Sequence, residues 1–124
     1  MTGDKNMESP LTIAQAQKAV DAWIRSTGAG YFGVLTNMAM LAEETGEVAR
    51  CISRIYGDQV AKTTDRLDLG DELADVMWVV MALANQCGVD LEKCFASNLK
   101  KKLDRDSARF AAGKRQDPAE EASS

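Results

Sequence analysis

Two acidic segments place carboxylates on faces of predicted helices that should be apolar. The segments, residues 41–50 and 70–76, carry five acids between them: Glu43, Glu44, Glu47, Glu72 and Asp75. Positions three or four apart share a helix face, so each set of acids occupies one arc. Apolar residues continue the same arcs, with Met40 and Cys51 in the first and Val79 and Leu83 in the second. A carboxylate on such a stripe is unstable unless it is protonated, paired or bound to a metal.

Converging carboxylates need cations, and few basic side chains lie nearby in the sequence. Two carboxylates about 4 Å apart repel by roughly 4 kcal/mol at an effective dielectric constant of about 20. Arg50 and Arg54 fall mostly off the acidic stripe, and Arg66 precedes the second segment. Ligand sets made only of oxygen favour a hard ion such as Mg²⁺, with Mn²⁺ as a possible substitute. A solvated acidic face is the alternative for either segment alone, whereas two segments together favour a metal site.

The length and composition favour a single all-α domain. The chain has 124 residues, of which 45% are hydrophobic and only two are proline. Helical spacing and end signals predict four helices, over residues 12–27, 31 or 34 to 56, 67–87 and 91–112. We therefore expect a four-helix-type bundle in residues 12–112. A loose arm is expected at 1–11 and a disordered tail at 113–124.

The composition also excludes several function classes. A net charge of −4 argues against a partner nucleic acid, and the absence of histidine removes histidine-based nucleophiles, bases and metal ligands. No apolar run is long enough to span a membrane, and residues 1–10 lack the apolar core of a signal peptide. The three cysteines, Cys51, Cys87 and Cys94, lack metal-site spacing and are expected to be core thiols. These features predict a cytoplasmic protein.

The second half of the last predicted helix is basic. Lys102, Arg105 and Arg109 are three and four positions apart, so they share one face. Alone, such a helix end is most simply a solvated face that complements the helix dipole. Together with carboxylate-bound metal ions, lysine and arginine form a clamp for a polyphosphate, which points to a nucleoside triphosphate.

The acidic pattern resembles that of the MazG-like all-α nucleoside triphosphate pyrophosphohydrolases. Their E-E-x-x-E and E-x-x-D motifs correspond here to Glu43-Glu44-x-x-Glu47 and Glu72-x-x-Asp75. The resemblance extends from about Leu11 to Phe110 and implies Mg²⁺-dependent hydrolysis to a nucleoside monophosphate and pyrophosphate. It also implies site roles: Glu44, Glu47, Glu72 and Asp75 as metal ligands, and Glu43 as the residue that orients or deprotonates the attacking water.

The same resemblance gives expectations for the rest of the substrate and for assembly. It implies phosphate contacts from Lys102, Arg105 and Arg109, whereas Asp106 stands where many members have asparagine. Candidates for nucleoside binding are Trp23, Tyr31, Phe32 and Asn37, for each of which a core or surface role is the alternative. Asp106 is a further candidate for a nucleoside contact. The bundle is expected to be completed by homo-oligomerisation, as a dimer or a dimer of dimers.

The resulting hypothesis is a house-cleaning enzyme that hydrolyses canonical or damaged nucleoside or deoxynucleoside triphosphates. The alternative is a helical-bundle sensor or scaffold that binds a nucleotide or metal without hydrolysis. The complete set of five acids favours the enzyme. The sequence leaves the base, the sugar and the number of metal ions open.

Overall fold

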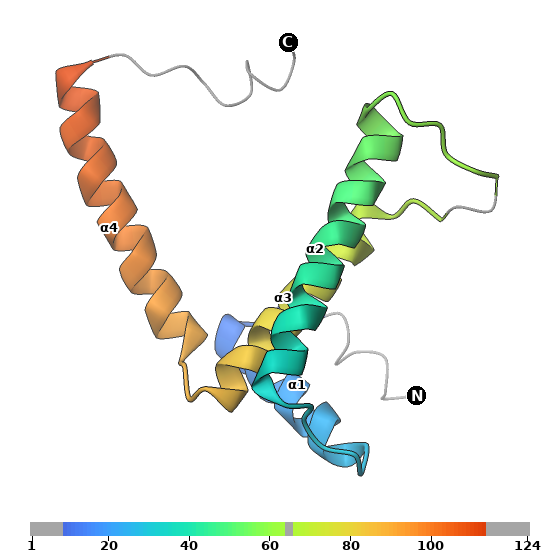
Figure 1. Ribbon diagram of the computed structural model, residues 1–124. Helices are drawn as coiled ribbons and strands as arrows, with labels where there is room; N and C mark the ends of the chain where they lie inside the picture. Colours follow the sequence, from blue (N-terminus) through green and yellow to red (C-terminus); the bar gives the residue numbers. More distant parts are fainter. Residues whose placement is uncertain (1–8, 64–65, 114–124) are drawn as a thin grey trace. The chain divides into compact units, whose positions relative to one another are not determined.

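The computed structural model describes residues 9–63 and 66–113, and these ranges contain four helices and no strand (Figure 1). The helices are α1 (Ile13–Ser26), α2 (Val34–Tyr56), α3 (Leu69–Gln86) and α4 (Leu91–Ala112). The predicted all-α fold is confirmed, and the helix bounds differ from the prediction by few residues. Most of the arm and tail predicted at 1–11 and 113–124 lies outside the described residues.

The helix ends follow from local sequence signals. The Thr12 side chain accepts a hydrogen bond from the Gln15 backbone N–H (3.1 Å), and the Gln15 side chain accepts one from the Thr12 N–H (2.8 Å). This is the predicted capping box, which satisfies two N–H groups that the first turn of α1 leaves without helical partners. Gly28 and Gly88 follow α1 and α3 with positive φ angles of 78° and 67°, which favour glycine.

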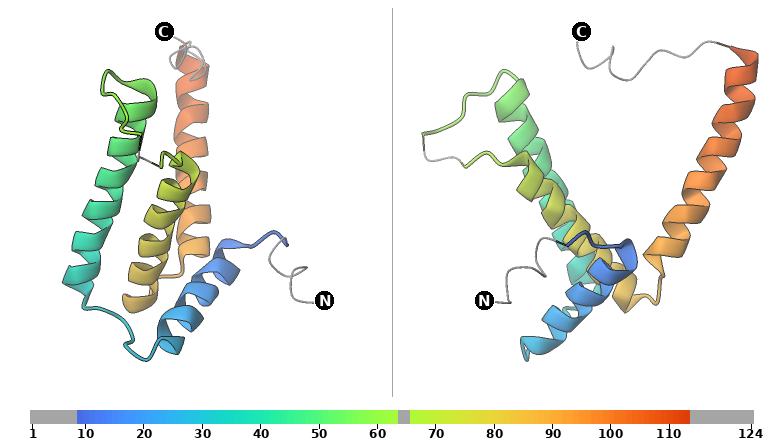
Figure 2. Two further views of the ribbon diagram at one scale, coloured as in Figure 1. Left: turned by 90° about the vertical axis from the view of Figure 1, so that its right-hand side faces the viewer. Right: turned by 180° about the vertical axis from the view of Figure 1, so that it is seen from behind.

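Helix α3 lies at the centre of the first compact unit, which ends at Leu91. It packs against α2 along one side and against α1 along the other, and α2 and α3 run antiparallel (Figures 1 and 2). The core cluster joins Val20 of α1 to Met81 and Ala82 of α3, with Ile24 and Tyr31 packed against it. This small core fixes α1 on the C-terminal half of α3.

Gln17 ties the turn after α3 to α1. Its side-chain N–H donates to the Val89 carbonyl (2.7 Å), and its side-chain oxygen accepts from the Leu91 N–H (3.2 Å). Asn85 also donates to the Gln17 carbonyl (3.0 Å). The turn is therefore held to α1 as far as Leu91. Residues from Glu92 onward form a second compact unit, which is described by itself.

The expectation that all three cysteines are core thiols is wrong for two of them. Cys51 is buried, but Cys87 and Cys94 are exposed. Cys87 is the C-cap of α3, and Cys94 lies on α4, whose unit buries no described side chain. In the described part of the chain, no helix combines the length and apolar character needed to cross a bilayer.

Asp68 caps α3, the helix that carries Glu72 and Asp75, by accepting a hydrogen bond from the Asp71 N–H (3.0 Å). We expect Asp68→Ala to lower the free energy of unfolding by about 1 kcal/mol, because that N–H loses its partner. Chemical denaturation followed by circular dichroism measures the change. Asp58→Ala, in the exposed connector, is the matched control. Equal stability of the two variants would contradict the capping role.

Candidate metal and nucleotide site

Three carboxylates from two helices converge on the seam between α2 and α3. One oxygen from each of Glu44, Glu72 and Asp75 lies within 4.8 Å of the others. Glu72 and Asp75 are three positions apart on α3, so they share the face turned toward Glu44 of α2. Glu44 and Glu72 are partly buried. This arrangement offers three oxygen ligands to one cation.

The electrostatic cost of this arrangement appears at Glu44. Partial burial raises the pKa of the Glu44 carboxyl above its ordinary value of 4.5, and the negative charges of the other four acids raise it further. The largest of these charge contributions comes from Asp75, followed by Glu72, Glu43 and Glu47. The other four acids of the sequence motif therefore all act on the Glu44 carboxyl.

The remaining acids of the motif, Glu43 and Glu47, do not belong to the group of three converging carboxylates. Glu43 is exposed on α2 beside Glu44. Glu47 is not part of the three-carboxylate group. Its Oε2 lies 3.0 Å from Nε of Arg50, one turn further along α2. The expectation that Arg50 falls off the acidic stripe is therefore wrong, because its long side chain reaches back to the Glu47 carboxylate.

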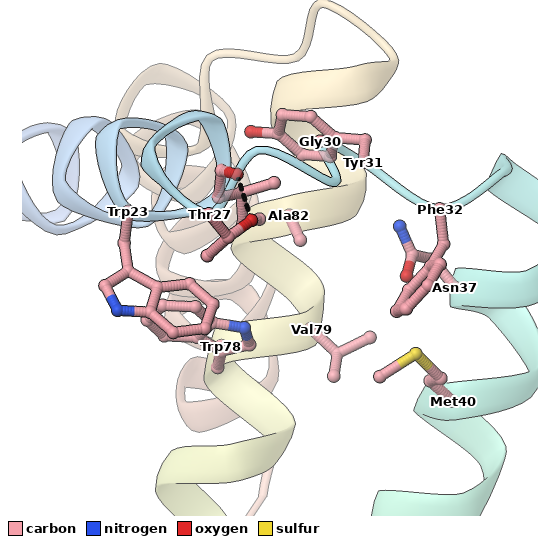
Figure 3. Close-up of a pocket in the computed structure, with 11 residues that line it drawn as sticks. Trp23, Thr27, Gly30, Tyr31, Phe32, Asn37, Met40, Trp78, Val79 and Ala82 are labelled. Carbon is pink, nitrogen blue, oxygen red and sulfur yellow. Dashed lines mark hydrogen bonds between the residues drawn. The ribbon is translucent and has the colours of Figure 1, made fainter.

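A pocket of about 390 Å³ opens between the end of α1, the loop before α2, and the facing sides of α2 and α3 (Figure 3). Its lining is mostly aromatic and aliphatic: Trp23, Ile24, Phe32, Met40, Trp78, Val79 and Ala82, with Thr27, Gly30, Tyr31 and Asn37. All four predicted nucleoside-binding candidates of the first unit line this pocket. Trp78, which lies on α3, was not among the predicted nucleoside-binding residues but lines the pocket as well.

The two tryptophans of the chain form one wall of the pocket. The rings of Trp23 and Trp78 meet edge to face, with centroids 5.3 Å apart. Tyr31 is fixed nearby because its hydroxyl donates to Asp21 (2.6 Å), and Arg25 binds the same carboxylate (3.0 Å). Both hydrogen bonds lower the pKa of Asp21, with the Tyr31 bond contributing most. Partial burial, followed by the bond to Asp21, raises the pKa of Tyr31.

The pocket and the three carboxylates lie on the same seam. Met40 of the pocket precedes Glu44 by one turn, and Val79 of the pocket follows Asp75 by one turn. One turn of helix advances about 5.4 Å along the axis. The mostly apolar pocket is therefore a direct neighbour of the acidic group, on both helices.

The predicted phosphate-binding residues lie on α4, in the second unit. Lys102, Arg105 and Arg109 are exposed on this helix. Asp106, which is partly buried, lies 3.4 Å from Nε of Arg105 and 4.0 Å from a terminal nitrogen of Arg109. Within this unit Asp106 therefore pairs with two of the three basic residues.

The raised pKa of Glu44 predicts a pH effect on stability without metal ions. Protonated Glu44 favours the folded state below pH 4.5, and this contribution is lost as the pH rises through the raised pKa. We expect Glu44→Gln to raise the melting temperature of the metal-free protein at neutral pH, and to raise it less near pH 4.5, the ordinary pKa of this group. Thermal denaturation in chelator tests this, with Asp104→Asn as the control. A lower melting temperature of Glu44→Gln at neutral pH would contradict the conclusion that the charged Glu44 carboxylate destabilises the metal-free fold.

Comparison with known proteins identifies the family. Residues 32–110 match the MazG nucleotide pyrophosphohydrolase domain. The chain is 36% identical to the Bacillus subtilis protein YpjD over 103 residues, which cover 82% of this chain and 93% of YpjD. It is 43% identical to the gene 37 protein of Mycobacterium phage L5 over 63 residues, covering 49% of this chain and 55% of that protein.

Solved structures agree with the sequence comparison. The crystal structure of YpjD matches with a TM-score of 0.67 and 34% identity, covering 75% of this chain and 94% of that one. A Bacillus-conserved MazG protein, a nucleotide pyrophosphohydrolase, matches with a TM-score of 0.64 and 35% identity, covering 75% and 90%. The chain therefore belongs to the MazG nucleotide pyrophosphohydrolase family and is a hydrolase that acts on acid anhydrides.

Proposed function

We propose that this protein hydrolyses nucleoside or deoxynucleoside triphosphates to a monophosphate and pyrophosphate, with Mg²⁺, as a house-cleaning activity on the nucleotide pool. The observation that carries the proposal is the convergence of Glu44, Glu72 and Asp75 within 4.8 Å. A base-sized pocket lies one helical turn away on the same seam. A triphosphate bound with its base in the pocket has its phosphates beside the carboxylates.

The donor set fits Mg²⁺. Its ligands would be Glu44, Glu72 and Asp75, which offer only carboxylate oxygens, and a bound cation would offset the negative charges that, after partial burial, raise the pKa of Glu44. Glu47 is a further candidate ligand once its carboxylate leaves Arg50. When bound, the ion supplies charge neutralisation for the triphosphate and lowers the pKa of a bound water.

The chain's own residues supply the proton transfer. Glu43 is exposed beside Glu44, so its carboxylate is free to face solvent at the edge of the acidic group. In the proposed reaction a water oxygen attacks the α-phosphorus, Glu43 accepts the water proton, and the bond from the α-phosphorus to the bridging oxygen breaks. Pyrophosphate leaves with that oxygen, and the nucleoside monophosphate remains.

Two sets of residues are proposed to contact the substrate. Trp23, Tyr31, Phe32 and Asn37 would hold the nucleoside, because they line the pocket beside the acids. Lys102, Arg105 and Arg109 would bind phosphate oxygens, with Asp106 setting the positions of the two arginines.

We also propose a homo-oligomer, a dimer or a dimer of dimers. Large apolar side chains lie exposed along the two central helices: Leu35, Met38, Ile52 and Tyr56 of α2, and Leu73 and Met77 of α3. Exposed apolar surface of this extent is typical of interfaces. Sedimentation analysis distinguishes the monomer, dimer and tetramer.

Glu72→Gln and Asp75→Asn test the metal ligands. Each replaces a charged ligand by a neutral amide of the same shape, so we expect turnover to fall by at least about 100-fold and the Mg²⁺-induced rise in melting temperature to disappear. Asp71→Asn, an exposed acid on the same helix, is the control and should retain both. Near-full activity in either variant would refute this ligand set.

Glu43→Gln separates proton transfer from metal binding. We expect kcat to fall by about 100-fold or more, as for loss of a general base, while Mg²⁺ still raises the melting temperature. If Glu47 is a metal ligand, Glu47→Gln should lower kcat and also reduce the rise in melting temperature that Mg²⁺ produces. Equal loss of Mg²⁺ stabilisation in the two variants would contradict the role of Glu43 as the base.

The function itself is tested by incubating the purified protein and Mg²⁺ with the common nucleoside and deoxynucleoside triphosphates, dUTP, and oxidised or methylated forms. Pyrophosphate with the matching monophosphate is the expected product pair. Mg²⁺-dependent binding with no product from any of them would instead support the sensor alternative.

A further inference from the structure

Asn37 is the one polar side chain that is buried among the described residues, and it lies in the wall of the nucleotide pocket. Its residue exposure is 5%. A buried carboxamide is costly unless its donor and acceptor atoms are paired. The partners of Asn37 therefore show which of its atoms the protein satisfies and which it leaves for a ligand.

A chain of hydrogen bonds fixes the orientation of this carboxamide. The Phe32 backbone carbonyl can only accept, so the Gln86 side-chain nitrogen must donate to it. The Gln86 side-chain oxygen then accepts from the Asn37 side-chain nitrogen at 2.7 Å. Because a backbone carbonyl starts the chain, neither amide can be turned over without losing a bond.

The Asn37 carboxamide oxygen is the one atom of the two side-chain amide oxygens that this series of hydrogen bonds leaves without a donor. It accepts no hydrogen bond from the described part of the protein. Figure 3 shows the oxygen on the Met40 side of the carboxamide and the nitrogen on the opposite side. The oxygen is thus presented as an acceptor in a pocket whose other walls are mostly apolar.

We infer that Gln86 is a positioning residue that acts through Asn37 to select the base. Gln86 holds the Asn37 oxygen toward the pocket, so the pocket takes a base edge that presents an N–H or amino donor there. A reversed carboxamide would present its N–H₂ group and favour an acceptor edge. The inference rests on the proposed function, since it assigns the pocket to the nucleobase.

The same series of hydrogen bonds also includes Phe32, a second residue that lines the pocket. Phe32, whose carbonyl is the terminal acceptor, also lines the pocket, and this residue is 59% exposed. Gln86 is therefore bonded to both a stacking residue and a hydrogen-bonding residue. Sequence reasoning did not single out Gln86, because a glutamine in the last turn of a helix is ordinarily a surface residue.

Binding of nucleoside monophosphates tests the inference without requiring turnover. The two tryptophans, Trp23 and Trp78, both line the pocket, so intrinsic fluorescence reports on it directly. In Gln86→Leu we expect binding of the preferred nucleotide to weaken about tenfold, as for one lost hydrogen bond, and its advantage over the other bases to shrink. Gln15→Leu removes an amide from the α1 cap, outside the pocket, and should leave the ranking unchanged.

A methylated nucleotide tests whether the pocket requires a hydrogen-bond donor on the base. The preferred nucleotide is compared with its form methylated at the base N–H or amino group. Wild type should bind the methylated form about tenfold more weakly, and Gln86→Leu should discriminate less between the two. Unchanged ranking and unchanged discrimination in Gln86→Leu would overturn the inference, even if all affinities fell together with stability.

Gln86→Glu provides a second test that does not depend on the folding of Gln86→Leu. A carboxylate at position 86 still accepts from the Asn37 side-chain nitrogen, although it cannot donate to the Phe32 carbonyl. We therefore expect Gln86→Glu to keep the wild-type base ranking, because the Asn37 carboxamide keeps its orientation, whereas Gln86→Leu loses the ranking. Loss of the ranking in Gln86→Glu to the same extent as in Gln86→Leu would overturn the inference. Nucleotide binding with an altered ranking but no hydrolysis would count only against the proposed function.

Discussion

The mutual repulsion of Glu44, Glu72 and Asp75 is the constraint around which the first unit is arranged. Three carboxylates on a helix seam destabilise the contact between α2 and α3, and partial burial together with the neighbouring negative charges raises the pKa of Glu44. The antiparallel packing of the two helices persists because apolar contacts continue the seam on either side of the acids, at Val79 and at Cys51. In the proposed function, a cation bound at this point would convert the destabilising element into a cross-link between the helices.

The pocket depends on the same seam but on a third helix as well. Helix α1 packs on the C-terminal half of α3 through Val20, and this places Trp23 beside Trp78. The loop that follows is held by the bond from Tyr31 to Asp21 and by the bond from Gln86 to the Phe32 carbonyl. A separate anchor thus fixes each of the three aromatic walls before any ligand arrives. Such preorganisation reduces the entropy lost on binding.

The sequence predicted the elements governed by local rules and missed those governed by side-chain reach. The Thr12 capping box followed from the spacing of Thr12 and Gln15, and the helix ends followed from the glycines that come after them. Spacing of three and four also put Glu72 and Asp75 on one face of α3, where they meet Glu44. Cβ directions alone predict Arg50 mostly off the stripe, but its long side chain reaches the Glu47 carboxylate. Gln86 acquired its role from partners 49 and 54 positions away, which no local pattern encodes. The exposure of Cys87 and Cys94 depends on tertiary packing, which decides the helix faces that other elements cover and which the local sequence does not encode.

The most direct test of the central claim is to follow the fate of a triphosphate by ³¹P nuclear magnetic resonance in ¹⁸O-enriched water, with Mg²⁺ present. Attack at the α-phosphorus predicts a nucleoside monophosphate that carries the ¹⁸O label and unlabelled pyrophosphate. A nucleoside diphosphate with labelled inorganic phosphate, or a label in the pyrophosphate, would contradict the account.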